Sequence, residues 1–348
     1  MASPIRDSAW LEWMASLMGV ASRQRVTAML PPHQFHCLLD ELPLHLIPGR
    51  GLDMERGNRE APDFLLLNPL CSILPAGKVP VELEDRRDLL DGFHLQNSIA
   101  WVRDPATDFP QPFWLGTNWE RILCQIQSGE VAPATLPREL RSVLTMAGIL
   151  TSAGRAKRRM AEWNAMAERG TATFRERNHA LLKNLIHPFH IAALRRYYRY
   201  AIRTGAIRLG DDQSPRRYVA HNSPVARYFH HQIASTVSAI VGEPVKPSYV
   251  YLAAYLSGAE LKKHTDREQC EFSVTLCLDF SPEPELATPW PIRLDVPDGS
   301  VKVYQALGDG LVYRGTAVPH SRDVLGEGRT STSIFFHYVP KDFSGTLD

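Results

Sequence analysis

The chain has 348 residues, of which 44% are hydrophobic, and this is enough material to bury one large core or two moderate ones. Its 39 basic and 38 acidic side chains nearly balance, which argues against an electrostatic drive towards nucleic acid or a membrane surface. No run of about 18 apolar residues could span a bilayer, and the first residues do not resemble a signal peptide. The five cysteines are an odd number without CxxC spacing, so we expect a reduced, cytoplasmic compartment.

Residues 1–150 are expected to form an accessory domain of mixed, mainly helical structure. A first helix begins near Asp7 or Ser8, either of which can cap it. Further along, two short helices over 119–129 and 136–150 lead to an apolar edge. This order resembles the helical part of a winged-helix fold. The alternative is a helical cap that supports the rest of the protein.

Residues 151–184 are charged and helix-prone, and we interpret them as a linker helix. Basic residues gather on its opening turns, at Arg155, Lys157, Arg158 and Arg159. Acidic residues interleave with them at Glu162, Glu168 and Glu176, which favours a solvated helix face over a nucleic-acid patch. We therefore place the domain boundary here and predict no nucleic-acid partner and no membrane partner.

Residues 185–348 combine helices with a series of short strands. Apolar residues at helical spacing predict helices over 191–202 and 225–240, each ending at a glycine. Strands are expected at 248–255, 271–280, 301–306, 310–314 and 329–339. Short strands separated by turn residues indicate a double-stranded β-helix, a cupin-like jelly roll, braced by the helices. The predicted fold class is α+β, with the proline-rich segment 280–301 as an insertion-like loop.

His264 and Asp266 form an HxD motif. In an extended strand, side chains alternate between faces, so residues two apart share a face and can hold one ion. With His320 arriving from another strand, two imidazoles and one carboxylate match ferrous iron sites that keep positions open for a cosubstrate and dioxygen. The motif alone is weak, because a chain with 13 histidines can contain HxD by chance. The alternative is an exposed strand pair and a histidine that caps a turn.

The surroundings of these residues have a specific spacing. Tyr255 precedes the HxD motif, while Arg329 and Ser331 follow nine and eleven positions after His320. In this combination, over roughly 185–340, the chain resembles the iron(II)- and 2-oxoglutarate-dependent dioxygenases, especially the prolyl-hydroxylase-like branch. Many members of that branch have a lysine where this chain has arginine, which still fits the wider family.

The resemblance implies roles for the matching residues. It implies iron ligands, and so the catalytic centre, at His264, Asp266 and His320. It implies a seat for the far carboxylate of 2-oxoglutarate at Arg329, Ser331 and Tyr255. The planar guanidinium of arginine suits two carboxylate oxygens. For Arg329 the alternative is an ordinary salt bridge with Asp309 or Asp323.

The implied reaction is hydroxylation of a C–H bond with Fe(II), 2-oxoglutarate and O2, releasing succinate and carbon dioxide. The prolyl-hydroxylase likeness favours a peptide or protein side chain as substrate, and a free amino acid or small metabolite is the alternative. From another class, a non-catalytic jelly-roll binding module remains open. Arg267 and Arg322 either meet an acidic substrate or are solvated. The remaining paired histidines are interpreted as packing or surface residues, at His187, His190, His230 and His231.

Overall fold

The computed structural model of the protein describes residues 34–42 and 65–347. The helix predicted near Asp7 lies outside these residues. Within them, no helix is both long and apolar enough to cross a membrane. All five cysteines carry free thiols.

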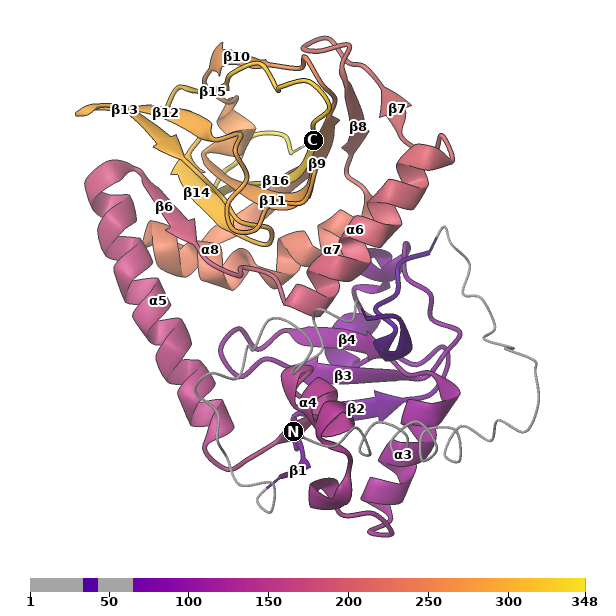
Figure 1. The fold of residues 1–348 in the computed structure, drawn as a ribbon. Helices are drawn as coiled ribbons and strands as arrows, with labels where there is room; N and C mark the ends of the chain where they lie inside the picture. The colour runs from indigo at the N-terminus through magenta and orange to yellow at the C-terminus, as the bar shows by residue number, and fades with distance from the viewer. Residues whose placement is uncertain (1–33, 43–64, 348) are drawn as a thin grey trace, which may run out of the picture.

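A seven-stranded antiparallel sheet forms the centre of the carboxy-terminal half (Figure 1). Its strand order is β6-β14-β11-β16-β9-β8-β7. The strands are β6 (His179–Leu182), β7 (Arg208–Leu209), β8 (Arg217–His221), β9 (Val245–Tyr255), β11 (Phe272–Ser281), β14 (Gly310–Arg314) and β16 (Thr330–Pro340). The predicted strands at 248–255, 271–280, 310–314 and 329–339 all belong to it.

A four-stranded antiparallel sheet, in the order β10-β15-β12-β13, faces the larger sheet (Figure 1). Its strands are β10 (Leu261–His264), β12 (Ile292–Val296), β13 (Gly299–Val303) and β15 (His320–Arg322). Apart from the β12–β13 hairpin, consecutive strands from β9 to β16 alternate between the two sheets. The chain therefore winds as a double-stranded β-helix, which agrees with the predicted jelly roll and the α+β class.

Two details of the predicted strands are wrong. Segment 280–301, expected as a loop, contains β12 and the start of β13, so its prolines punctuate a hairpin rather than an insertion. The alternation expected from Phe272 to Phe280 also breaks, because the pairing of β11 with β16 shifts register between Cys277 and Asp279. Phe280 consequently packs in a different apolar cluster from the rest of the predicted series.

Three helices cover the outer face of the seven-stranded sheet: α6 (Pro188–Arg203), α7 (Pro224–Gln232) and α8 (Ala234–Val241). Proline occupies the first turn of α6 and α7, where its missing N–H costs nothing. The predicted helix over 225–240 is two helices, which are divided at Ile233, where φ is −93° and ψ is 0°. The second ends at Gly242, whose φ of 83° suits a residue without a side chain.

The amino-terminal half contains a three-stranded antiparallel sheet, β2-β3-β4, with two helices beside it. The predicted helices at 119–129 and 136–150 correspond to α3 and α4, and the second ends earlier than expected. The elements are 3-10 helices η1 (Leu39–Glu41), η4 (Arg87–Leu90) and η5 (Pro133–Thr135), helices α2 (Val81–Glu84), α3 (Thr117–Gln127) and α4 (Arg138–Met146), and strands β1 (Leu66–Leu67), β2 (Cys71–Leu74), β3 (Ile99–Arg103), β4 (Pro110–Trp114) and β5 (Leu150–Thr151).

An aromatic seam joins the two halves. The ring of Phe93 lies 4.8 Å from that of Tyr228 on α7, and the ring of Phe35 lies 5.6 Å from that of Phe229. The Tyr228 hydroxyl donates to the carbonyl of Pro110. The two halves thus share one continuous apolar core rather than meeting across a polar surface.

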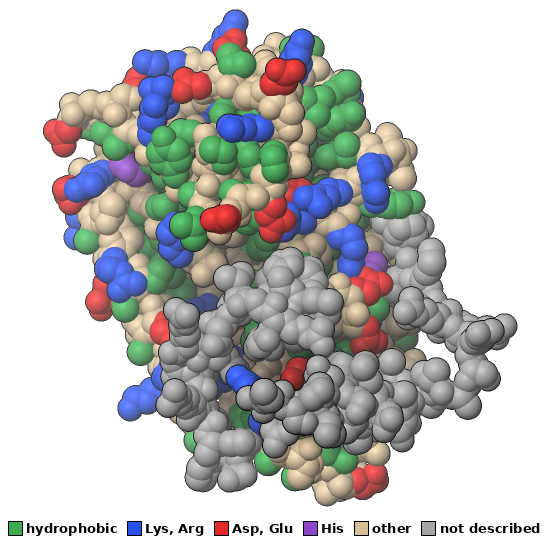
Figure 2. Space-filling model, in the orientation of Figure 1, with side chains coloured by type: hydrophobic (Ala, Val, Ile, Leu, Met, Phe, Trp, Pro, Cys, Tyr) green, Lys and Arg blue, Asp and Glu red, His purple; other side chains and the backbone are tan. Residues whose placement is uncertain are grey.

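Helix α5 (Arg155–Arg177) connects the halves where the linker helix was predicted (Figure 1). Strand β6 follows it directly and pairs with β14, so the seven-stranded sheet begins within segment 151–184 rather than after it. The division into domains remains a prediction. Basic and acidic side chains are interspersed over the face shown in Figure 2, as the balanced charge leads one to expect.

Candidate metal centre

Two neighbouring strands of the smaller sheet bring the predicted ligands together. His264 on β10 lies directly opposite His320 on β15, and their rings are 4.3 Å apart. Asp266 follows β10, and its Oδ1 lies 3.7 Å from His264 Nε2 and 3.6 Å from His320 Nε2. These three side chains are therefore close enough to hold a single metal ion.

The orientation of both imidazoles fits a metal. His264 Nδ1 lies 2.8 Å from the carbonyl of Lys262, and His320 Nδ1 lies 3.1 Å from that of Val318. Because a carbonyl only accepts hydrogen bonds, each Nδ1 carries a proton. The Nε2 atom of each ring faces Asp266 and is the nitrogen that a metal would use. Burial lowers the pKa of His320, which keeps that ring neutral. The Nε2 atoms of the two histidines and the carboxylate of Asp266 together form a suitable ligand set for a divalent metal ion.

Asp266 is held by its surroundings. Ser273 on β11 donates its hydroxyl to Asp266 Oδ2 at 2.7 Å, while the Asp266 N–H donates to the carbonyl of Gly315 at 2.9 Å. A Cβ on Gly315 would lie 2.5 Å from Asp266 Oδ2 and 2.7 Å from Ser273 Oγ. Glycine is thus needed at this position for the carboxylate to approach.

A second group of potential ligands, Asp266, Cys270 and His337, lies beside the first. Burial raises the pKa of the Cys270 thiol to about 12, and its sulfur lies 3.1 Å from the Tyr249 hydroxyl. A thiol that stays protonated is a poor ligand. We therefore assign this group to the support of Asp266 rather than to a second metal.

A buried arginine lies two residues beyond the second histidine. Arg322 donates to the carbonyl of Trp290 at 2.7 Å, and its guanidinium lies 4.7 Å from the Trp290 ring. The side chain is 5% exposed and forms no ion pair with a carboxylate in the described part of the chain. Burial lowers its pKa, yet a guanidinium stays charged. Arg322 also donates to Gln305 Oε1 at 3.4 Å, but a buried cation that meets only neutral groups is costly, and an anionic ligand beside it would offset that cost.

Unpaired polar atoms accompany this arginine. Among the described residues, Arg322 Nε and Ser333 Oγ are both buried without a hydrogen-bond partner. Ser333 lies opposite Cys277, whose thiol is near enough to the Arg322 cation to feel its charge, although burial dominates and raises the pKa of that thiol. Unsatisfied donors and acceptors inside a fold are uncommon, and two of them close to a buried cation are consistent with a site for a polar ligand.

The predicted seat for the far carboxylate is only partly assembled. Ser331 and Tyr255 are buried and lie opposite each other on β16 and β9, and the Tyr255 hydroxyl accepts a bond from Arg217 at 3.2 Å. Arg329, in contrast, lies exposed on the turn before β16, against Gly326. Arg329 forms no ion pair with Asp309, which pairs with Lys183, or with Asp323, which pairs with Arg293. The structure offers Arg322 as the buried cation, where we expected Arg329.

The other histidine pairs are structural where they are buried. His190 Nε2 donates to the carbonyl of Pro112, and His230 Nε2 donates to that of His337. His187 Nε2 donates to the carbonyl of Met146. His231 accepts from Arg86 at 2.6 Å. These contacts agree with the expectation of packing residues.

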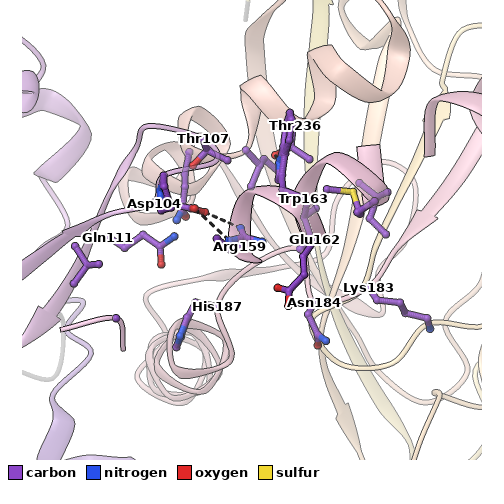
Figure 3. A pocket seen from close by; sticks show the side chains of 18 of the residues that line it. Asp104, Thr107, Gln111, Arg159, Glu162, Trp163, Lys183, Asn184, His187 and Thr236 are labelled. Atoms are coloured by element: carbon purple, nitrogen blue, oxygen red, sulfur yellow. Dashed lines mark hydrogen bonds and ion pairs between the residues drawn. The ribbon is translucent and has the colours of Figure 1, made fainter. Parts of the chain in front are cut away.

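A cavity of about 780 Å³ lies between the amino-terminal sheet, α5 and the start of α6 (Figure 3). None of its lining residues belongs to the metal cluster. Its charged groups are largely satisfied, since Arg159 donates two bonds to Asp104 and both nitrogens of His187 are engaged. Although large, the cavity does not bring together a set of reactive side chains.

Comparisons with known proteins follow this geometry. No family model matches the chain, and no curated protein matches it. Among solved structures, it is similar to the non-haem alpha-ketoglutarate-dependent epimerase SnoN of nogalamycin biosynthesis, with 13% identity and a TM-score of 0.43 over 51% of this chain and 84% of that one. It is also similar to a Pseudomonas putida prolyl-4-hydroxylase, with 18% identity and a TM-score of 0.41 over 49% of this chain and 99% of that one.

A third similar structure is HygX from Streptomyces hygroscopicus, solved with nickel, 2-oxoglutarate and hygromycin B bound. It has 12% identity and a TM-score of 0.40, over 50% of this chain and 88% of that one. Likeness at these TM-scores does not define an activity. The functional conclusion therefore depends on the residues of this chain.

Proposed function

We propose that the protein is a 2-oxoglutarate-dependent oxygenase that uses Fe(II) and O2. The observation that carries the proposal is the pairing of two features inside one roll. The imidazoles of His264 and His320 and the carboxylate of Asp266 converge at one point. The buried guanidinium of Arg322, which has no carboxylate partner among the described residues, follows His320 on β15. The first suits a divalent metal, and the second suits an acid.

The spacing of the two features suits a five-carbon keto diacid. His320 and Arg322 share a face of β15, and same-face neighbours on a strand are roughly 6.6 Å apart. A ligand that chelates the metal through its keto acid end can therefore present its far carboxylate to Arg322. Ser333, Ser331 and Tyr255 supply buried hydroxyls around this path. We propose Arg322 for the cationic role that the sequence suggested for Arg329.

When bound, Fe(II) would supply dioxygen activation coupled to decarboxylation of 2-oxoglutarate to succinate. His264, Asp266 and His320 would hold the metal, and a set of three ligands leaves coordination positions for the cosubstrate and dioxygen. Tyr313 is buried, and its hydroxyl lies 3.4 Å from His320 Nε2, so it borders the metal position on the ligand side of that ring. The side chains thus bind and orient, while the cofactors provide the chemistry.

For the substrate, we propose a side chain of a peptide or protein that undergoes hydroxylation at C–H. The His264 side chain is 30% exposed, so the metal position opens to solvent at the rim of the roll. Lys262, Lys263 and Arg267 are exposed beside it. An open rim admits a large substrate, and a free amino acid or small metabolite is the second candidate.

The test combines binding with turnover. Anaerobic addition of Fe(II) and 2-oxoglutarate should produce a metal-to-ligand charge-transfer band, and candidate substrates should accelerate succinate formation and gain one oxygen in mass. Arg322→Met should raise the 2-oxoglutarate concentration needed for half-maximal signal by at least about tenfold, because a charge-assisted pair contributes about 1.5–3 kcal/mol.

Arg329→Met is the matched control, since it removes the same charge from the exposed turn. It should leave the 2-oxoglutarate dependence unchanged. A large effect at Arg329 with none at Arg322 would restore the role suggested by the sequence. Absence of the charge-transfer band in the wild-type protein would instead favour a non-catalytic jelly-roll binding module.

A further inference from the structure

Three side chains form a row across the inner face of the seven-stranded sheet, directly behind the metal cluster. Ser273 on β11 lies opposite Tyr313 on β14 and opposite His337 on β16. Ser273 Oγ is 2.7 Å from Asp266 Oδ2 and 2.9 Å from His337 Nδ1. The serine is fully buried and His337 is 6% exposed, so water does not compete for these bonds.

The direction of the two hydrogen bonds follows from their chemistry. A carboxylate that ligates a metal is ionised and can only accept, so the single hydroxyl proton of Ser273 goes to Asp266. The serine oxygen must then accept from His337, which fixes the proton of that imidazole on Nδ1. The ring of His337 is held in turn by Tyr249, whose ring lies 4.6 Å away.

The two carboxylate oxygens of Asp266 have different surroundings. Oδ2 is occupied by Ser273 and is confined on its other side by the backbone at Gly315. Oδ1 is the atom that faces the two histidine nitrogens. A carboxylate held in this way offers one oxygen to the metal and keeps the other away from it.

We propose that Ser273 and His337 are positioning residues that fix Asp266 as a monodentate metal ligand. The proposal rests on the proposed function and extends it to residues that do not touch the metal. A bidentate carboxylate would fill one of the positions that a facial site keeps free for cosubstrate and dioxygen. The pair Ser273–His337 therefore keeps that position available as well as orienting the ligand.

The test uses Co(II) as the probe, with the full chain and without oxygen or cosubstrate. Ser273→Ala should weaken Co(II) binding in titration calorimetry by about 10–100-fold, the usual effect of losing a partner that orients a ligand. The visible absorption bands of the Co(II) protein should also change in shape and intensity, because a released Asp266 can rotate and use both oxygens. A merely structural loss of a hydroxyl would not alter this spectrum.

Further variants separate positioning from folding. Ser273→Cys keeps nearly the same volume with a much weaker donor, and should reproduce the alanine result in a protein with wild-type circular dichroism. His337→Phe keeps a ring against Tyr249 without the Nδ1 donor, and should give a smaller loss in the same direction. Ser142→Ala is the matched control, because it removes a buried hydroxyl from α4 in the amino-terminal half.

The outcomes distinguish the two proposals. Wild-type affinity and spectrum in both Ser273 variants would overturn the positioning role. In that case, loss of Co(II) binding in His264→Ala would still support the metal site. If the wild-type protein itself bound no Co(II), the proposed function would fail together with the inference. Weak binding and altered bands in the Ser273 variants, with a normal Ser142→Ala control, would support the positioning role.

Discussion

The two faces of strand β11 belong to one strand but differ in almost every respect. The outward side chains of Phe272, Val274 and Leu276 are fully buried against the helices. The inward side chains of Ser273 and Thr275 are equally buried, yet they are polar, and Ser273 donates to Asp266. Burial alone therefore does not separate core from site here. What separates them is polarity: the outer side chains bury only apolar atoms, whereas Ser273 on the inner face bonds to Asp266 and His337.

This difference predicts that the two faces fail in different ways when altered. Changes on the outer face should cost folding free energy and leave the properties of the folded molecule intact. Changes on the inner face should leave the fold largely in place and remove binding. The predictions below begin with the largest expected effect.

Asp266→Ala should abolish metal binding and turnover, a loss greater than the roughly 100-fold effect of removing a residue that only orients a ligand. It removes the only carboxylate of the three-ligand group. Metal content after Fe(II) loading and succinate formation measure the effect. Thermal unfolding of the metal-free protein should remain close to wild type. Retained metal at one equivalent would contradict the site.

Leu276→Ala should lower the free energy of unfolding by about 2–5 kcal/mol, as a truncated leucine in a packed core does. Leu276 is fully buried in the cluster that joins the sheet to its helices. Urea unfolding measures the loss, and Co(II) affinity of the folded fraction should match wild type. A variant with normal stability and impaired metal binding would reverse the assignment of the two faces.

Acid should destabilise the protein below about pH 6.5, even without metal. Burial lowers the pKa of His187 to about 4 and that of His190 to about 3. Below pH 6.5 these histidines bind protons in the unfolded chain but remain neutral in the folded chain. The free energy of unfolding therefore decreases as the pH is lowered. For His187 the full loss is about 3 kcal/mol once the pH reaches its folded value. Urea unfolding at pH 8 and pH 5 tests this, and equal stabilities would contradict it.

The smallest effect is expected at the thiols. Cys277 on the inner face is 3% exposed, and burial raises its pKa to about 12, whereas Cys124 on α3 is exposed. Iodoacetamide should therefore modify Cys124 in the native protein and reach Cys277 only in denaturant. Mass spectrometry of the digested protein identifies the modified residue. Rapid native labelling of Cys277 would show that the roll is open at this depth.

The HxD spacing and the family resemblance together predicted which three side chains would meet, although Asp266 lies just beyond the end of β10. His264 and Asp266 are two positions apart, and the structure brings them together with His320 as predicted. The cationic role of Arg329 stays a prediction, and the exposure of this side chain has a local reason. Strand β16 begins at Thr330, so Arg329 falls on the preceding turn and does not inherit the inward direction of Ser331. Alternation within β15 also predicts that Arg322 shares a strand face with His320. The match of Arg329 to the family spacing drew attention away from this prediction.

The support of Asp266 was less accessible to prediction. Continuing the alternation of Ser331 and Ser333 along the strand leads to His337, so its inward face could be read from the sequence. Its partner could not, because the contact of His337 with Ser273 depends on the register between β11 and β16, which are far apart in the chain. That register also shifts beyond Cys277, and a single sequence carries no mark of such a bulge.

The aromatic seam limits how this molecule can be rebuilt. Tyr228 and Phe229 extend from α7 into a socket formed by Phe35 and Phe93, so the surface between the halves is an interior rather than a boundary. A chimaera that transplants the roll onto another amino-terminal partner would leave these rings facing water unless the new partner carried a matching socket. Exchange of parts between such proteins should therefore succeed only when the break is made outside the seam.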